Sequence, residues 1–293
     1  MSTQTDAAPE TRPLYWSVRR ELWENRSIVL APLATAGVIL FGFLISTIGM
    51  PERRRAALLL DAAHRQAAIE KPYDVAAMML LLTAMIVGVF YCVDALHGER
   101  RDRSILFWQS LPVSDLTTVL AKASIPLVIL PLITFVVVVA TQLLMMLLST
   151  AVLLPSGLGT TTWTNVPFFR MSVVLLYGLI ALVLWHAPIY GWLLLVSGWA
   201  RRAAFLWAVF PLFAVAVLER IAFNTSYFAA LLKYRFMGHL PQAFLFKPDG
   251  RIDSLSQLTP GKFLSTPGLW IGLALAAAFL AAAVRLRRSR GPI

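Results

Sequence analysis

Six long apolar stretches constrain the fold of this chain more than any other feature of its sequence. Their interiors contain no Asp, Glu, Lys or Arg. A hydrocarbon core of about 30 Å requires roughly 20 apolar residues per helix, and one charge at a helix centre costs about 2.5 to 3.5 kcal/mol. We therefore predict an all-α integral membrane protein with six transmembrane helices, at residues 28–48, 75–93, 123–154, 171–199, 203–218 and 267–284.

The overall composition supports a membrane setting. Hydrophobic residues make up 58% of the chain, charged residues make up 14%, and the mean hydropathy is +0.72. These values lie far from those of an ordinary soluble domain. The net charge of +11 would suggest nucleic-acid binding in a soluble protein, but here the basic residues cluster at the ends of the apolar stretches. We interpret them as topological anchors and expect no nucleic-acid partner.

The distribution of basic residues predicts that both termini are cytoplasmic. This orientation leaves twelve of the 26 basic residues outside, where residues 53–55 are three consecutive arginines beside a span. We expect residues 52–70 to form an Ala-rich outer helix. The cytoplasmic side then holds Arg12, Arg19, Arg20, Arg26, Arg100, Arg101, Arg103, Lys122, Arg201, Arg202, Arg285, Arg287, Arg288 and Arg290.

Several single residues within the spans have predicted structural roles. The lone cysteine, Cys92, forms no internal disulfide and is expected to be a small core residue. Pro126, Pro131 and Pro188 predict bends or tilt. His186 is expected to bond to a backbone carbonyl that Pro188 leaves without a donor, in preference to a substrate contact. The first span is expected to serve as its own insertion signal.

The segment before the first span, residues 14–26, has the composition of an amphipathic interfacial helix. At 100° per residue, Leu14, Tyr15, Val18 and Leu22 share one face, and tryptophans lie on an adjoining face. Tryptophan and arginine together suit the headgroup region of a membrane. Two interpretations stay open: a simple anchor to membrane lipid, or a lever on the inner leaflet that also touches a soluble partner.

The loop between spans five and six, residues 219–266, is long and rich in aromatic residues. It has more aromatic side chains than a disordered linker, so we expect short re-entrant or surface helices that cap the outer mouth of a pathway. Glu219 and Arg220 stand at its start. They are either interfacial residues or members of an outer gate.

A compact polar insert, residues 97–122, separates spans two and three. Arg100, Arg101 and Arg103 follow span two directly, as in cytoplasmic loops. An apolar cluster follows on a segment that must stay outside the bilayer core, and such a cluster requires a protein surface to pack against. The loop therefore predicts a binding site for a soluble partner, with an apolar cluster of Ile105, Leu106, Phe107, Trp108 and Leu111.

The six-span layout, the N-terminal helix and this insert together resemble a type-2 ATP-binding-cassette (ABC) exporter permease over nearly the whole chain. The most specific part is the insert, which reads Glu99, Arg100, Ser104, Ile105, Leu106, Leu111, Pro112, Ser114 and Lys122. In that family this segment is the coupling helix, which binds a groove on a nucleotide-binding subunit. The resemblance implies the partner-binding residues Glu99, Arg100, Arg101, Arg103, Ser104, Phe107, Trp108, Leu111 and Pro112.

The resemblance also implies that ATP binding and transport belong to different polypeptides. The chain has no GxxxxGK[ST] phosphate loop and no LSGGQ run, so this single permease domain, residues 1–293, is not expected to be an enzyme or to hold a cofactor. ATP and Mg would be bound by a partner ATP-binding subunit. A second permease copy or a related permease would complete the pathway in a bacterial inner membrane, and spans one, two and five would line it.

Two other functional classes compete with this interpretation. An ion-coupled secondary transporter usually carries carboxylates inside the membrane and broken repeat helices, and the predicted spans have no Asp or Glu. A channel without an ATPase partner leaves the insert unexplained. His64, His97, His186 and His239 lack metal-site spacing. The sequence does not choose among drugs, lipidic molecules and peptides as cargo.

Overall fold

The computed structural model describes the whole chain except residues 1–11, 105, 108–112, 247–251, 253 and 290–293. The described residues form helices and connections, with one isolated β-bridge between Phe244 and Leu258. Six helical segments in this part are long and apolar enough to cross a membrane: Ser27–Ser46, Ala62–Arg101, Asp115–Ser156, Phe168–Trp199, Ala204–Phe223 and Pro267–Ser289. Each overlaps one predicted stretch, so the prediction of six apolar helices of spanning length is confirmed.

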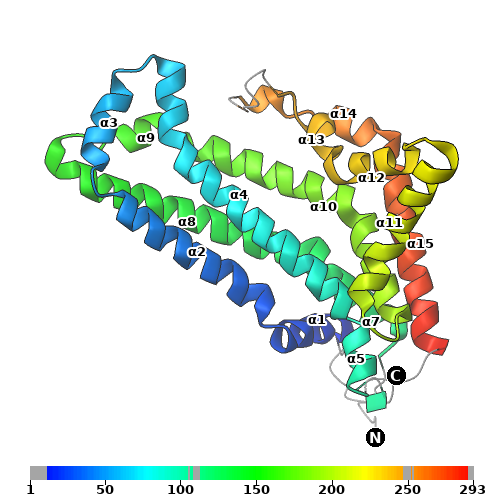
Figure 1. Ribbon diagram of the computed structural model, residues 1–293. Helices are drawn as coiled ribbons and strands as arrows, with labels where there is room; N and C mark the ends of the chain where they lie inside the picture. Colours follow the sequence, from blue (N-terminus) through cyan, green and yellow to red (C-terminus); the bar gives the residue numbers. More distant parts are fainter. Residues whose placement is uncertain (1–11, 105, 108–112, 247–251, 253, 290–293) are drawn as a thin grey trace, which may run out of the picture.

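Three of the long helices pack as one group. They are α2 (Ser27–Ser46), α4 (Ala62–Asp94) and α8 (Leu130–Leu153), and they lean together to one side in Figure 1. Leu80 and Val138 are fully buried between them, and Ala36 completes this core. The small Ala36 side chain lets the α2 backbone approach its neighbours closely, as small residues do in membrane helix packing.

The second group is built on α10 (Phe168–Trp199) and α15 (Pro267–Ser289), which pack together extensively. The helix α11 (Ala204–Phe223) stands beside them, and α10 also contacts α4 and so joins the two groups. In the second group Gly191 of α10 lies against the backbone of Ala276 in α15. Side chains on the outward surface of α11 are large and apolar, among them Phe210 and Phe213.

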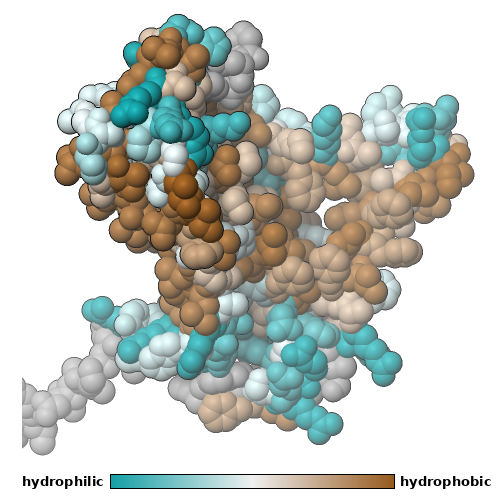
Figure 2. Space-filling view, turned by 60° about the vertical axis from the view of Figure 1, so that its left-hand side comes forward, coloured by the Kyte–Doolittle hydropathy of each residue, from teal (hydrophilic) through white to brown (hydrophobic). Residues whose placement is uncertain are grey.

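The surface of the molecule is divided by polarity. Figure 2 shows a broad hydrophobic band with hydrophilic residues above and below it. This arrangement is expected of a multi-pass membrane protein, because lipid-facing side chains must be apolar and charged groups must lie at or beyond the interfaces. Cys92 is completely buried, as the sequence predicted.

Span three contains the irregularity that its prolines predicted. The helix α7 (Asp115–Ser124) leads into a π-helical segment, Ile125–Ile129, before α8 begins. Pro126 lies in that segment and has no N–H to donate, so the regular hydrogen-bond ladder is interrupted there. The helix α10 continues through Pro188 and changes direction along its length in Figure 1.

The connection after α2 differs from the prediction. Residues 52–70 do not form one helix, because α3 (Met50–Leu58) ends and α4 begins at Ala62. Asp61 separates the two by accepting a hydrogen bond from the backbone N–H of His64 at 3.4 Å. Asp is among the residues preferred at the start of a helix. Alanine-rich sequence is compatible with a helix on both sides of Asp61, so the sequence did not show that one helix ends and another begins here.

The long loop between α11 and α15 contains short helices, as predicted. It contains α12 (Tyr227–Met237), α13 (His239–Ala243), a 3-10 turn at Leu255–Gln257 and α14 (Pro260–Ser265). Ala243, Phe244 and Phe263 from this loop pack against Trp185 of α10. The other outer loop has a 3-10 turn at Leu154–Ser156 and the short helix α9 (Thr161–Asn165).

The close approach of α10 and α15 predicts the effect of enlarging Gly191. A Cβ there would lie 3.3 Å from the Ala276 oxygen and 3.4 Å from its Cα. Because these neighbours are backbone atoms, we expect Gly191→Val to lower the free energy of unfolding by about 1 to 3 kcal/mol. Thermal unfolding in detergent would measure the loss. Gly37→Val in α2 is the matched control, since a Cβ at Gly37 meets no described atom within 4 Å.

Candidate functional site

One end of the bundle holds a set of six acidic and basic side chains, four buried and two partly buried, which we call the ionic cluster. Lys122 is at its centre, with its Nζ 2.8 Å from Glu21 Oε1 and 3.0 Å from Glu99 Oε1. The cluster joins α1 (Pro13–Glu24), α5 (His97–Arg101), α7 and α15. Its members are Arg20, Glu21, Glu99, Asp115, Lys122 and Arg287.

Two arginines complete the cluster. Arg20 Nη2 lies 2.8 Å from Glu21 Oε1 and 3.2 Å from Glu99 Oε1. Arg287 donates from Nη1 to Glu99 Oε2, and its Nε lies 3.1 Å from Asp115 Oδ1. Three cations therefore balance three carboxylates. This balance matters because removing ions from water is costly unless each one is paired and hydrogen bonded.

The centre of the cluster is well shielded from solvent. Glu21 is 1% exposed and Lys122 is 2% exposed. The Tyr91 hydroxyl at the end of α4 donates to Glu21 Oε2 at 2.8 Å, so both oxygens of this carboxylate are used. Four helices from distant parts of the sequence are thus held together by short polar contacts.

A second set of contacts attaches the start of the insert to the end of α10. Arg100 Nη1 donates to the carbonyl oxygens of Gly198 and Ala200 at 2.8 and 3.3 Å. These are carbonyls at a helix C-terminus, where a cation is favourable. Ser197 Oγ accepts from the backbone N–H groups of Leu96 and His97 at 2.9 and 2.8 Å. The start of the insert, which we call its base, is therefore held to the end of α10 both by the Arg100 side chain and by the backbone N–H groups of Leu96 and His97.

Two of the predicted partner-binding residues are buried within this chain. Glu99 and Arg100 are 7% and 6% exposed, and both bind other parts of the same chain. Their side chains are not available to a partner on the surface, so we assign them to positioning the insert. The sequence pattern could not distinguish an inward charge from an outward one.

Other residues of the insert do lie at the surface. Arg101 is exposed and pairs with Asp94 at 3.5 Å and with Asp102 at 3.1 Å. Arg103 is also exposed and has a positive φ of 58°. Ser104 donates from its hydroxyl to the Glu99 carbonyl at 3.4 Å. These residues surround the beginning of the apolar cluster.

The described part of the apolar cluster projects outward. Leu106 and Phe107 are 57% and 59% exposed, and we call these two residues the apolar tip. Trp108, Leu111, Pro112 and Ile105 lie outside the described residues. Ser114 then caps α7 by accepting from the Thr117 N–H at 3.1 Å. The insert therefore ends at Ser114, where α7 begins.

The helix α1 has its polar face inward. Ser17 and Glu21 are buried, whereas Trp16 and Trp23 are more than half exposed. The Arg19 guanidinium lies over both tryptophan rings, 5.3 and 4.6 Å from their centroids. The sequence predicted the helix but missed Glu21 as the residue that holds it. No local signal distinguished Glu21 from its charged neighbours, because its partners Tyr91 and Lys122 are 70 and 101 positions away in the sequence.

The two residues predicted for an outer gate have local structural contacts. Glu219 accepts from the Thr225 hydroxyl at 2.7 Å and from the backbone N–H groups of Tyr227 and Phe228 at 2.6 and 2.8 Å. It therefore caps the start of α12. Arg220 donates to the Asn224 carbonyl at 3.2 Å, near the end of α11. These contacts shape the turn between the two helices.

His186 bonds to a carbonyl other than the predicted one. Its Nδ1 lies 2.8 Å from the Leu182 oxygen, not from the Leu184 oxygen that Pro188 leaves without a donor. Its ring also contacts that of His239, with centroids 5.0 Å apart. The described residues contain no group of three or more His, Cys, Asp or Glu side chains placed to hold a metal ion.

Comparisons of the chain with protein-family models, with curated proteins and with solved structures found no match. Assignment of a function therefore depends on the residues and contacts of this chain.

Removing the central cation should disrupt the ionic cluster. Lys122→Met would leave Glu21 and Glu99 with less compensation at a buried position. Breaking a buried ion pair in this way costs about 3 to 5 kcal/mol of unfolding free energy. Arg288→Met is the control, because the 66% exposed Arg288 pairs with Asp115 at 3.6 Å and such pairs contribute about 0 to 1 kcal/mol. Equal thermal stability of the two variants in detergent would contradict the assignment.

The cluster also predicts a loss of stability in acid. Burial alone would raise the pKa of the Glu21 carboxyl, but the Lys122 ammonium and Arg20 guanidinium outweigh it and hold the pKa below its usual range. The contribution is therefore complete above about pH 4.3, the usual Glu value, and is lost as the pH falls through the lowered pKa. Thermal unfolding between pH 7 and pH 3 should show this loss, and Glu21→Gln should show a lower and flatter profile.

Proposed function

We propose that this chain is the transmembrane permease subunit of an ABC exporter. Its role would be to couple ATP hydrolysis by a separate nucleotide-binding subunit to export across the membrane. The observation that supports this proposal is the exposed apolar tip on a base fixed by the ionic cluster and by Arg100. Apolar side chains outside the bilayer favour a protein partner, and a fixed base allows that partner to move the helices.

The fixed base provides a route for mechanical coupling. A partner that displaces the apolar tip would move α5 at the end of α4 and α7 at the start of span three. The ionic cluster would transmit the same displacement to α1 and α15. Packed helices respond as rigid bodies between discrete arrangements. The π-helical segment Ile125–Ile129 is a suitable place for α8 to change its angle to α7.

The proposed partner surface consists of an apolar centre and a basic rim. Leu106 and Phe107 form the described part of the centre, and Arg101 and Arg103 form the rim. Exposed charges at such a rim affect association rate more than final affinity. ATP and Mg would be bound by the partner subunit.

The proposal includes an orientation for the chain. The outward tryptophans of α1, with Arg19 stacked on them, suit the headgroup region of the cytoplasmic leaflet. Both termini and the insert would then be cytoplasmic, in a bacterial inner membrane. A second permease copy or a related permease would pack beside this one, and membrane lipid would cover the remaining apolar surface.

One observation favours the competing class of ion-coupled transporters. The helix α4 begins before the predicted second span, and it therefore includes Glu70 and Asp74. Carboxylates on a spanning helix are a feature of proton- and sodium-coupled transport. An ion-coupled carrier needs no ATPase, so the two proposals differ in whether an ATPase associates with the chain.

Association with an ATPase is the direct test of the exporter proposal. The detergent-solubilised chain should co-purify with the product of a neighbouring ATPase gene, and ATP hydrolysis should be detectable in the complex. We expect the Phe107→Asp and Trp108→Asp double variant to lose co-purification, because ions are unfavourable in an apolar contact. Leu59→Asp is the control, since Leu59 is 89% exposed and distant in sequence from the insert. Retained association in the double variant would exclude the insert as the contact.

The orientation has an independent test. Phe107→Cys introduces an exposed thiol, whereas the only native cysteine, Cys92, is fully buried. A membrane-impermeant maleimide should therefore label this variant in inside-out vesicles and not in intact spheroplasts. Labelling from the outer side would contradict the cytoplasmic assignment of the insert.

A further inference from the structure

A long cavity lies between three of the long helices. Its volume is about 620 Å³, and it is lined by α4, α8, α10 and the short helices α12 and α13. Met171 and His186 of α10 both line it, and a rise of about 1.5 Å per residue places them about 22 Å apart along that helix. This length and volume suit a single hydrocarbon chain.

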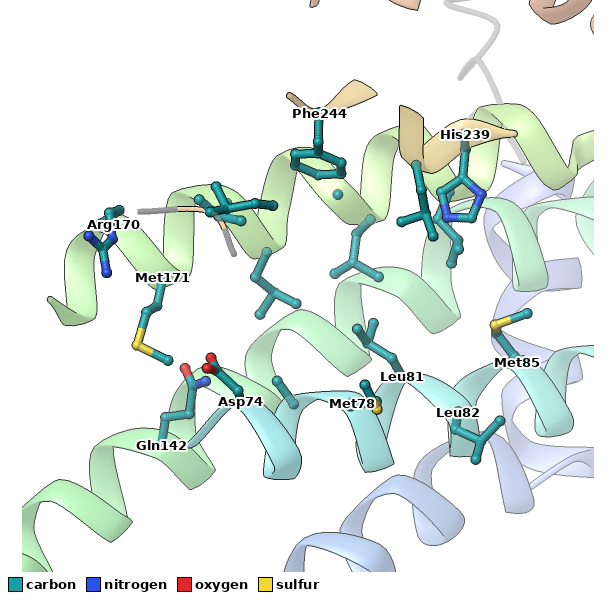
Figure 3. A pocket seen from close by; sticks show the side chains of 18 of the residues that line it. Asp74, Met78, Leu81, Leu82, Met85, Gln142, Arg170, Met171, His239 and Phe244 are labelled. Atoms are coloured by element: carbon teal, nitrogen blue, oxygen red, sulfur yellow. The ribbon is translucent and has the colours of Figure 1, made fainter. Parts of the chain in front are cut away.

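The walls of the cavity are largely apolar. Three methionines line it, Met78 and Met85 from α4 and Met171 from α10, as Figure 3 shows. Methionine is unbranched and adapts to ligands of irregular shape. A chain bound in the cavity would contact these flexible side chains along much of its length. No residue of the ionic cluster is among the described residues that line the cavity, so the two sites are separate.

The cavity opens sideways along α4. Met78 and Leu82 line it and are 70% and 58% exposed, so the same side chains also belong to the surface of the molecule. Both lie in the apolar part of α4, which would face lipid chains in a membrane. A ligand that enters here comes from the bilayer and must therefore dissolve in it.

The acidic and basic side chains at one end of the cavity interact with other groups of the protein. Arg170 Nη2 lies 2.8 Å from Glu70 Oε1, and Asp74 also has an interaction within the chain. These residues are therefore already engaged by the protein. The polar atoms of the cavity that lack a partner among the described residues belong instead to neutral side chains, Gln142 and His239.

Gln142 presents a buried acceptor to the cavity from near the middle of α8. It is 3% exposed, and its Oε1 has no hydrogen-bond partner among the described residues. Its Nε2 donates to the Tyr73 carbonyl at 3.3 Å, which fixes the orientation of the amide. Figure 3 shows the side chain directed from α8 toward α10. A buried acceptor without a partner is unfavourable, and a ligand with an O–H or N–H group would supply the missing donor.

His239 lies at the other end of the cavity. It is 8% exposed, and its Nδ1 has no hydrogen-bond partner within the described part of the chain. Burial first, and then the neighbouring His186, lower the pKa of His239 to about 4, so the ring is neutral at pH 7. A neutral ring can donate or accept at Nδ1, depending on its tautomer, whereas Gln142 Oε1 can only accept. Gln142 therefore sets the stricter requirement on a ligand.

We propose that this cavity binds an uncharged single-chain amphiphile, whose head donates a hydrogen bond to Gln142 Oε1 and whose hydrocarbon chain lies along the methionine-lined walls. The head follows from the buried acceptor, and the chain follows from the length and apolar walls of the cavity. A long-chain alcohol is the simplest member of this class. Interpreting the amphiphile as cargo rests on the proposed exporter function, whereas binding itself depends on the cavity alone.

Photolabelling locates the ligand. The chain would be reconstituted in lipid nanodiscs with dodecanol that carries a diazirine in its hydrocarbon chain, and the labelled peptides would be identified by mass spectrometry. We expect saturable labelling of cavity residues on α4 and α10, such as Met85 and Met171. Saturable labelling confined to helices that do not line the cavity would overturn the proposal.

Competition between two matched compounds tests the head. Dodecanol and 1-methoxydodecane share one chain, but the ether oxygen has no hydrogen to donate. Both would be added as mole fractions of the nanodisc lipid, so that transfer from water does not enter the comparison. We expect dodecanol to displace half of the probe at a mole fraction about tenfold lower, as expected when the ether leaves the buried acceptor without a donor. Equal mole fractions would overturn the proposal.

Matched variants assign the head to Gln142. Gln142→Met keeps a similar length and removes the acceptor, so the two compounds should then compete equally. Thr141→Val is the control, because Thr141 is also buried in α8, donates to the Val137 carbonyl at 2.7 Å and does not line the cavity. It should retain the tenfold difference. A difference retained in Gln142→Met, or lost in Thr141→Val, would contradict the assignment. The wild-type comparison stays decisive if a variant does not fold.

A cavity-filling variant gives a second readout of location. Ala77 lines the cavity, so Ala77→Phe should remove most of the saturable labelling. Leu59→Phe is the control, because Leu59 is 89% exposed and does not line the cavity. Equal labelling of the two variants would contradict the site. These experiments need no ATPase, so loss of ATPase association and absence of amphiphile binding are separate outcomes.

Discussion

Lys122 between Glu21 and Glu99 is the interaction on which the rest of this structure depends. An ammonium group buried at the edge of a membrane bundle is unfavourable unless carboxylates compensate for it. Here the compensating groups come from α1 and α5, and Arg287 of α15 shares the Glu99 carboxylate. The ends of α1, α5, α7 and α15 are therefore brought into one fixed arrangement. The insert then projects from a defined base.

The polar groups of the protein serve two different purposes in two places. In the ionic cluster three cations pair with three carboxylates, which favours one geometry. In the cavity between α4, α8 and α10, Gln142 Oε1 and His239 Nδ1 have no hydrogen-bond partner among the described residues. Incomplete satisfaction is expensive in a folded protein, so its presence in a cavity indicates capacity for a ligand.

Local sequence patterns predicted much of the fold, and the errors have physical causes. The apolar stretches located all six long helices, and Pro126 marked the irregular start of span three. The outer helix was wrong because alanine-rich composition is compatible with a helix on both sides of Asp61, and the cap itself decides the break. The burial of Glu99 and Arg100 could not be read from the motif, because a motif gives residue order but not the direction of a side chain.

The sequence by itself determined that this chain forms long apolar helices and that its insert carries a basic segment followed by apolar residues, since both depend on neighbouring residues. Only the tertiary structure decided that Glu21, Lys122 and Arg287 meet, and that Asp74, Gln142 and His239 line one cavity. Glu21 and Lys122 are 101 positions apart in the sequence, and Glu99 and Arg287 of the same cluster are 188 apart. Such pairings follow from helix packing across the whole bundle, which no local pattern encodes.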